Sequence, residues 1–282
     1  MTGWQSEQIR RNRRTRDCWD RYAAHRARVT ELLVGPPAEV QSGDRQLGLL
    51  GFGNGNDVDL QRLAEHFSRI LLVDLDSAAV EAGWARQQPF SAEVLQIGGD
   101  VDCSGILEWI GAWCGGTLPA DQEVAACLAA AAAAPLPALL RNLDGIGSLC
   151  LLSQILEAAH QALGPQHPSL LPLIRVLRQR HLEQLVAALR PGGRGLILID
   201  FVSSETCPEL ATVAEAELAD LAKELLRQRN FFTGLNPLVL WQQLQQPPFA
   251  AQVRAVQLSA PWRWHFPART YAVCGLQFVK QP

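Results

Sequence analysis

The stretch from Leu49 to Asp57, which reads LLGFGNGND, decides the fold of this chain. It begins inside an apolar run, Leu47 to Gly51, that has the character of a buried strand, and a helical pattern over Val58 to Phe67 follows it. Glycines let a backbone turn tightly and approach a ligand closely, and free amide groups at the start of a helix favour polar or anionic groups. A ligand-binding loop is therefore predicted here, although a plain tight turn would use the same glycines.

Segments that alternate between strand and helix surround this loop. After it come an apolar strand at Ile70 to Val73, a helix over Ser77 to Gln87 and a short strand at Glu93 to Ile97. Later strands are predicted at Gly145 to Leu152 and Gly195 to Asp200. Strands that alternate with helices form parallel sheets with right-handed crossovers, so the chain is predicted to be an α/β protein.

The two ends of the chain depart from this alternation. The last two apolar segments, Gln252 to Leu258 and Tyr271 to Val279, are separated by a short connection that contains two prolines. That connection leaves little room for a helix, so the two segments are predicted to pair as antiparallel strands. Residues 4–34 show helical spacing until Gly35, and we expect residues 1–37 to form an N-terminal helical extension, with the main domain at 38–282.

The composition restricts the partners that the protein can have. The chain has 282 residues, a hydrophobic fraction of 48% and a formal net charge of -3, which suits one large core and provides no overall positive field for nucleic acid. The arginines between Arg10 and Arg28 form one local basic patch, but Asp17 and Asp20 interrupt it. A solvated helical face is the simpler interpretation, and we expect no nucleic-acid partner.

The cysteines and histidines indicate neither a disulfide framework nor a metal site. The seven cysteines are scattered and contain no C-x-x-C pair, and the six histidines do not cluster at metal-ligand spacing. The N-terminus lacks the apolar run of a signal peptide, and prolines at 135 and 137 interrupt the most hydrophobic later segment. We therefore expect a cytoplasmic protein with reduced thiols, no metal and no membrane segment.

Five motifs in chain order resemble those of class I S-adenosylmethionine-dependent methyltransferases. They are the glycine loop at 49–57, VDLDSAAV at 73–80, GDV at 99–101, DGIGSLCLLSQ at 144–154 and LRPGGRGLILID at 189–200. Together they cover roughly Gln46 to Val202. The resemblance implies a Rossmann-like, mostly parallel seven-stranded sheet with helices on both faces and an antiparallel C-terminal strand. It also implies S-adenosylmethionine as the cofactor and methyl transfer as the reaction.

The resemblance also assigns candidate site residues. Asp74 closes the second strand, where a carboxylate can accept the hydroxyl protons of a ribose. The implied cofactor-binding set is Gly51, Gly53, Asn54, Gly55, Asn56, Asp57, Asp74, Leu75, Asp100, Val101 and Ser148. The candidate substrate-binding set is Tyr22, Cys150, Ser153, Gln154 and Tyr271. Methyl transfer depends largely on in-line positioning and needs no metal, so we assign no catalytic residue.

One position departs from the family pattern. Members commonly carry an acidic residue two positions before the first glycine, near the methionine end of the cofactor, and this chain has Leu49 there. Either Asn54, Asn56 or Asp57 substitutes for that acid, or the chain binds the cofactor more weakly.

Two other functions remain open from the sequence. A dinucleotide-binding loop needs its third glycine at position 56, where this chain has Asn, and an antiparallel end does not suit an NAD(P)-dependent oxidoreductase. A regulatory protein that binds the cofactor without catalysis would share the same loop. For an enzyme we expect a small-molecule acceptor.

We expect the N-terminal helix to cover this acceptor with the side chains of Trp19, Tyr22, His25 and Arg26, and the segment from Trp262 to Tyr271 to face it. The alternative is that these side chains only pack the helix against the core.

Overall fold

The computed structural model describes residues 3–35, 44–88, 95–98, 100–113 and 119–282. Within these residues eight strands form one sheet, and seven of them follow the order β3-β2-β1-β4-β5-β8-β6. The strands are β1 (Gln46–Leu50), β2 (Arg69–Val73), β3 (Leu95–Gly98), β4 (Leu143–Ser148), β5 (Leu189–Ser203), β6 (Val253–Leu258), β7 (Trp262–His265) and β8 (Thr270–Lys280).

The pairing confirms the predicted fold class. Strands β1 to β5 pair with one another in parallel, and β8 is antiparallel to both β5 and β6. The expected count of seven strands omits β7, which pairs with β8 outside the main order. Its sequence, Trp262 to His265, was interpreted as a connection because prolines flank it closely on both sides.

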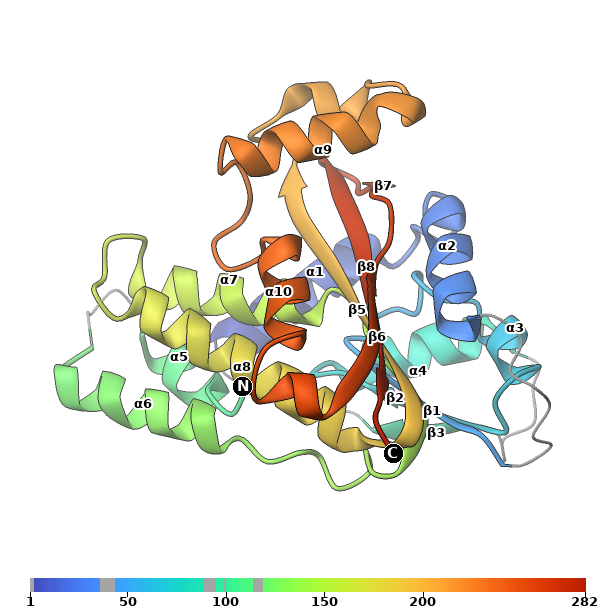
Figure 1. The fold of residues 1–282 in the computed structure, drawn as a ribbon, viewed down its shortest axis with the longest axis horizontal. Coiled ribbons are helices and arrows are strands. Elements are labelled where there is room, and N and C mark those ends of the chain that lie inside the picture. Colours follow the sequence, from blue (N-terminus) through green and yellow to red (C-terminus); the bar gives the residue numbers. More distant parts are fainter. Residues whose placement is uncertain (1–2, 36–43, 89–94, 99, 114–118) are drawn as a thin grey trace.

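Helices cover both faces of the sheet (Figure 1). On one side lie α5 (Leu107–Trp113), α6 (Asp121–Ala133), α7 (Leu151–Leu163), α8 (Leu170–Ala188) and α10 (Pro237–Leu244), and on the other α2 (Ala23–Val34), α3 (Leu60–Ala64) and α4 (Ser77–Arg86). The remaining helices are α1 (Gly3–Thr15) and α9 (Leu218–Arg227). None of the helices in the described ranges is long and apolar enough to cross a membrane.

The strands divide their side chains between two cores, as the period of two in a strand requires. On β2, Ile70 and Leu72 pack toward α2, α3 and α4, whereas Leu71 and Val73 pack toward α5 to α8. The same alternation on β1 and β5 holds the parallel centre of the sheet in place. The loops after β1, β2 and β4 meet at its carboxyl edge, where open α/β sheets commonly bind their ligands.

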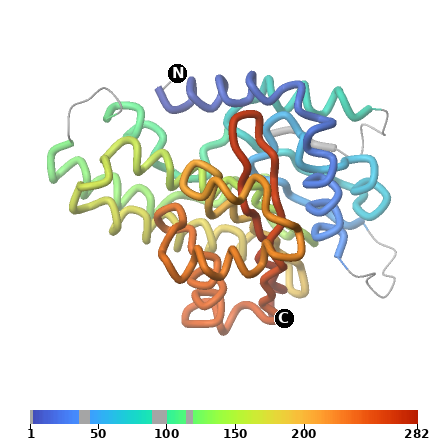
Figure 2. The backbone as a smooth tube through the Cα atoms, turned by 90° about the horizontal axis from the view of Figure 1, so that it is seen from above, coloured from blue at the N-terminus to red at the C-terminus, as the bar shows by residue number. Residues whose placement is uncertain are grey.

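The predicted N-terminal helix at 4–34 is in fact two helices, α1 and α2, which the turns of residues 16–22 separate (Figure 2). Helix α2 buries Val29 and Leu33 in the core formed with Leu47 and Leu49, so this part of the extension belongs to the main fold. Helix α1 does not pack in this core and lies instead along the carboxyl edge of the sheet.

Three other predicted boundaries change. The strand predicted to reach Leu152 ends at Ser148, and α7 begins at Leu151. The strand predicted at Gly195 to Asp200 is longer, because β5 extends from Leu189 to Ser203. The helix predicted over Val58 to Phe67 is shorter, because α3 covers only Leu60–Ala64.

Candidate functional site

The glycine loop lies where the sequence places it, directly after β1. Gly51 has a φ of 74°, and a Cβ atom there would lie 3.1 Å from the carbonyl oxygen of Leu149 and from Cβ of Leu151. Any side chain would therefore be strained and crowded against the start of α7. The end of β1 therefore lies close to the start of α7, at the carboxyl edge of the sheet.

Asp74 holds the loop in position. Its carboxylate accepts hydrogen bonds from the backbone N–H of Gly53 at 2.8 Å and of Asp76 at 3.0 Å. Burial raises the pKa of Asp74 to about 6, although these two backbone donors partly offset the effect. Each carboxylate oxygen keeps a second lone pair that can accept a hydroxyl proton from a ligand.

Two adjoining cavities open at this edge. The large cavity has a volume of about 480 Å³ and the small cavity one of about 30 Å³. Four residues line both of them: Gln8, Gly51, Asp74 and Gln154. The acid predicted to bind a ribose therefore stands at the junction of the two spaces.

Most of the predicted site residues come together around these cavities. The large cavity is lined by the predicted cofactor-binding residues Gly51, Gly53, Asn54, Asn56, Asp57 and Asp74, and by all five predicted substrate-binding residues, Tyr22, Cys150, Ser153, Gln154 and Tyr271. Leu75 and Val101 line the small cavity. What these residues bind stays a prediction.

Three predicted cofactor-binding residues lie elsewhere. Ser148 is fully buried, and its Oγ forms a 2.8 Å hydrogen bond with Nε2 of His181, because this position on β4 faces α8. Asp100 is exposed and Gly55 packs against the ring of Phe52, so neither lines a cavity. Gly99, the first residue of the third motif, lies outside the described residues.

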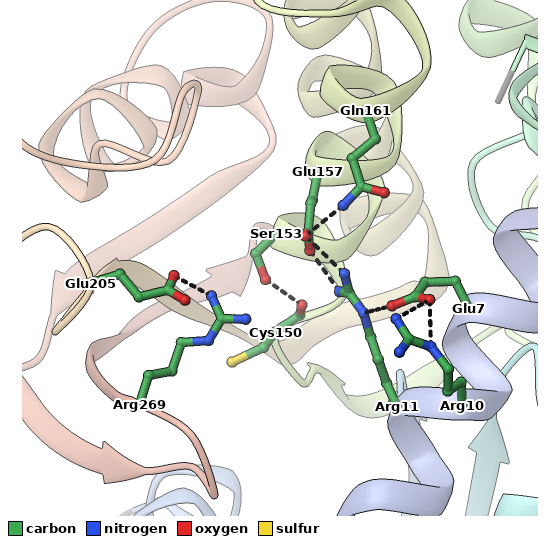
Figure 3. Close-up of polar contacts among 9 residues, drawn as sticks. All are labelled: Glu7, Arg10, Arg11, Cys150, Ser153, Glu157, Gln161, Glu205 and Arg269. Carbon is green, nitrogen blue, oxygen red and sulfur yellow. Dashed lines mark hydrogen bonds and ion pairs between the residues drawn. The ribbon is translucent and has the colours of Figure 1, made fainter. Parts of the chain in front are cut away.

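Helix α1 covers the site, which sequence reasoning did not specify. Arg11 forms hydrogen bonds of 2.6 and 2.8 Å to both carboxylate oxygens of Glu157 on α7 (Figure 3). Asn12 donates to Asp76 at 3.0 Å after β2. The α1 residues Gln8, Arg11, Asn12 and Thr15 line the large cavity, and Trp4 and Gln8 line the small one. No local sequence pattern predicts these contacts, because they join residues that are far apart in the chain.

The two loop asparagines are used to hold α1. Asn54 Nδ2 donates to the carbonyl oxygen of Asn12 at 2.6 Å, and Asn56 Nδ2 donates to that of Thr15 at 2.7 Å. The Nδ2 atoms of both asparagines are therefore occupied. Asp57, the third candidate to replace an acid at Leu49, has its Oδ1 3.5 Å from Nε2 of His25. Leu49 itself is completely buried in the core.

The N-terminal helix predicted at 4–34 is expected to cover the acceptor through four of its side chains. Of Trp19, Tyr22, His25 and Arg26, only Tyr22 lines the large cavity. Arg26 stacks on the ring of Trp19 at 3.5 Å from its centroid, and His25 packs behind the cavity wall. Trp19 and Tyr22 lie in the turns of residues 16–22 and His25 and Arg26 in α2, whereas residues of α1 line both cavities.

An aromatic wall, formed by Tyr22, Trp264, Phe266 and Tyr271, faces the glycine loop across the large cavity. Neighbouring rings lie 5.2 to 5.9 Å apart between centroids. His25 stacks on Trp264 at 4.6 Å, and burial lowers the pKa of His25 to about 3, so the ring is neutral. The prediction that 262–271 forms one side of a pocket agrees with this arrangement.

Two buried acids also line the large cavity. Oδ1 of Asp57 and Oδ1 of Asp200 are inaccessible to solvent and have no hydrogen-bond partner in the described parts of the chain. Burial raises the pKa of each carboxyl group to about 7. The sequence indicates Asp200 only as the end of a predicted strand. A polar residue that ends a buried strand at the carboxyl edge of the sheet is a signal that could have marked it as a site residue. Within the described residues, no group of three or more His, Cys, Asp or Glu side chains is placed to hold a metal ion.

No family model and no curated protein sequence matches the chain. Among solved structures, it is similar to the N-methyltransferase NodS from Bradyrhizobium japonicum WM9 in complex with S-adenosylhomocysteine, at 12% identity and a TM-score of 0.47 over 99% of each chain. It is also similar to the Burkholderia thailandensis 1,6-didemethyltoxoflavin-N1-methyltransferase, at 17% identity and a TM-score of 0.48, over 99% of this chain and 87% of that one. This likeness is too distant to say what the chain binds, which has to be argued from its own residues.

Proposed function

We propose that the chain is an S-adenosylmethionine-dependent methyltransferase that acts on a small-molecule acceptor. One observation carries the proposal: the glycine loop and Asp74 stand at the junction of a narrow apolar space and a large aromatic-walled cavity. A nucleoside in the narrow space would direct the rest of the cofactor toward the large one. The five predicted substrate-binding residues line this large cavity.

The chain's own residues suit each part of this cofactor. Leu75 and Val101 offer apolar contacts for an adenine, and Asp74 offers lone pairs to the ribose hydroxyls. The carboxylate of Asp57, which lines the large cavity, would accept hydrogen bonds from the ammonium group of the methionine part and so replace the acid missing at Leu49. When bound, S-adenosylmethionine supplies a methyl group activated by a sulfonium. The protein excludes water and positions the acceptor.

The small cavity, with a volume of about 30 Å³, is smaller than an adenine, so α1 has to take part in binding. Trp4 and Gln8 of α1 are buried and line this cavity. We infer that α1 moves outward when the cofactor enters and then closes again over both cavities. The polar links of α1 to the loop and to α7 would guide its return.

The alternatives fit the geometry less well. A dinucleotide fold would continue with parallel strands where β8 runs antiparallel, and the third glycine would occupy position 56, whose side chain here holds α1. A non-catalytic cofactor-binding protein would not need a second, aromatic-walled space beside the cofactor site. Nucleic acid would meet five carboxylates in the lining of the large cavity, from Asp57, Asp74, Glu157, Asp200 and Glu205.

Calorimetric titration with S-adenosylhomocysteine tests the proposal. We expect saturable binding to the purified protein and a loss of about 1.5 to 3 kcal/mol of binding free energy in Asp74→Ala, the usual range for hydrogen bonds to a charged group. Asp220→Ala on the exposed face of α9 serves as the matched control and should bind like the parent protein. Absence of binding in the folded parent protein would refute the proposed function.

A further inference from the structure

Asp200 occupies an unusual position for a carboxylate. It lies near the end of β5, its side chain is only 8% exposed, and its Oδ1 has no hydrogen-bond partner among the described residues. Leaving a buried acceptor unpaired costs stability, and this carboxyl group also belongs to the lining of the large cavity, where a ligand with a donor group would be favoured. The buried hydroxyl of Tyr22, in the same lining, also lacks a partner.

The sheet brings Asp200 beside the aromatic wall. Asp200 pairs with Val273 on β8, and Tyr271 lies two residues before Val273, on the same face of that strand. Tyr271 in turn pairs with Trp264 on β7, and their ring centroids are 5.5 Å apart. Three neighbouring strands therefore present one acid and two aromatic rings to the same cavity.

The charged side chains that line the large cavity favour a positively charged ligand. The two arginines of the cavity are already paired: Arg11 contacts Glu7 and Glu157, and Arg269 contacts Glu205 at 2.5 Å (Figure 3). Asp200 forms no ion pair with any described residue. The surplus charge is negative, and aromatic faces attract cations. An acidic or phosphorylated ligand would be repelled.

We propose that the methyl acceptor is an amine, whose nitrogen binds between the carboxylate of Asp200 and the aromatic wall. This inference rests on the proposed function, because it identifies the substrate class of the same site. An ammonium group in the cavity donates a hydrogen bond to the carboxylate of Asp200. The rings of Trp264 and Tyr271 stabilise its charge, and the hydroxyl of Tyr22 supplies a further polar contact.

Asp200 also provides a place for the proton that an amine must lose. Burial raises the pKa of Asp200 to about 7, against the pull of the Ser153 hydroxyl and the Cys150 thiol, so the carboxylate can take a proton near neutral pH. The neutral nitrogen then forms a bond to the methyl carbon as the methyl–sulfur bond breaks and leaves a thioether. The product is a methylated ammonium, and Asp200 returns its proton to solvent.

Binding of 2-phenylethylamine tests this assignment, with 2-phenylethanol and phenylacetate as matched probes. Titrations are made with the full chain, both alone and saturated with S-adenosylhomocysteine. We expect the amine to bind about 10-fold or more tightly than the alcohol, the effect of one charge-assisted hydrogen bond, and we expect no binding of the acid. Asp200→Asn should remove the preference for the amine, and Tyr271→Leu should reduce it.

Asp57→Asn separates the two proposals, because it should weaken S-adenosylhomocysteine and leave the preference for the amine intact. Thermal unfolding of each variant checks its folding, and Tyr271→Leu still tests the wall if Asp200→Asn does not fold. Equal binding of amine and alcohol, or an unchanged preference in folded Asp200→Asn, would overturn the amine assignment even if S-adenosylhomocysteine binds. Failure of S-adenosylhomocysteine to bind would overturn the proposed function instead.

Discussion

Asp200 shows at the scale of one residue how a buried acid in a cavity lining costs stability. Burial holds the pKa of its carboxyl group at about 7, above the ordinary value of 3.8. The folded state therefore binds this proton more tightly than the unfolded state does. The stabilising effect of that proton is complete below about pH 4 and is lost as the pH rises to 7, so the free energy of unfolding falls over this window.

Asp200→Asn should remove this loss. We expect the variant to match the parent protein at pH 4 and to exceed its free energy of unfolding by about 2 to 4 kcal/mol at pH 8, since one unit of pKa shift corresponds to about 1.4 kcal/mol. Urea denaturation at the two pH values measures the difference. A gain of the same size at both pH values would show that the charge of Asp200 is not its source.

Helix α1 is the element whose position matters most for the site. Trp4 is buried against the core of α5 and α7, and polar contacts tie the rest of α1 to α7 and to the loops after β1 and β2. Helix α2, by contrast, contributes Val29 and Leu33 to the core beneath β1. The two halves of the N-terminal extension therefore differ: α1 covers the site, and α2 supports the sheet.

Deletions of two lengths separate these roles. Removal of residues 1–16 should leave a cooperatively folding protein whose free energy of unfolding falls by about 3 to 5 kcal/mol, the usual cost of losing one large buried aromatic side chain. S-adenosylhomocysteine should dissociate from it faster, because α1 no longer covers the cavities. Removal of residues 1–37 should abolish cooperative unfolding, because the core loses α2. Circular dichroism with thermal melting, and stopped-flow measurement of ligand release, give the two readouts. An unchanged dissociation rate in the shorter deletion would contradict the covering role of α1.

At the scale of the whole molecule, ligand binding should stabilise the fold in a way that identifies the ligand. S-adenosylhomocysteine at about 100 times its Kd should add about 2.7 kcal/mol to the free energy of unfolding and raise Tm by about 5 to 10 °C. NAD⁺ at the same concentration should leave Tm unchanged, because β8 and the loop do not form a dinucleotide site. A shift with NAD⁺ and none with S-adenosylhomocysteine would reverse the assignment.

The sequence by itself determined the alternation of strands and helices from β1 to β5, the glycine loop after β1 and the place of Asp74 after β2. These features depend on local properties: the period of apolar residues, the freedom of glycine and the place where a strand ends. The motifs also predict Ser148 and Asp100 as cofactor-binding residues, but Ser148 faces the interior, Asp100 is exposed, and neither lines a cavity. Local pattern cannot specify which side of a strand end meets a cavity.

Only the tertiary structure decided what surrounds the ligand loop. The contact between Arg11 and Glu157 joins residues 146 positions apart, and Asp200 meets Tyr271 through the pairing of β5 with β8. Such contacts depend on packing between elements that no periodicity in the chain records. The cover over the site and the acid beside the aromatic wall could therefore be recognised only once the sheet had brought them together.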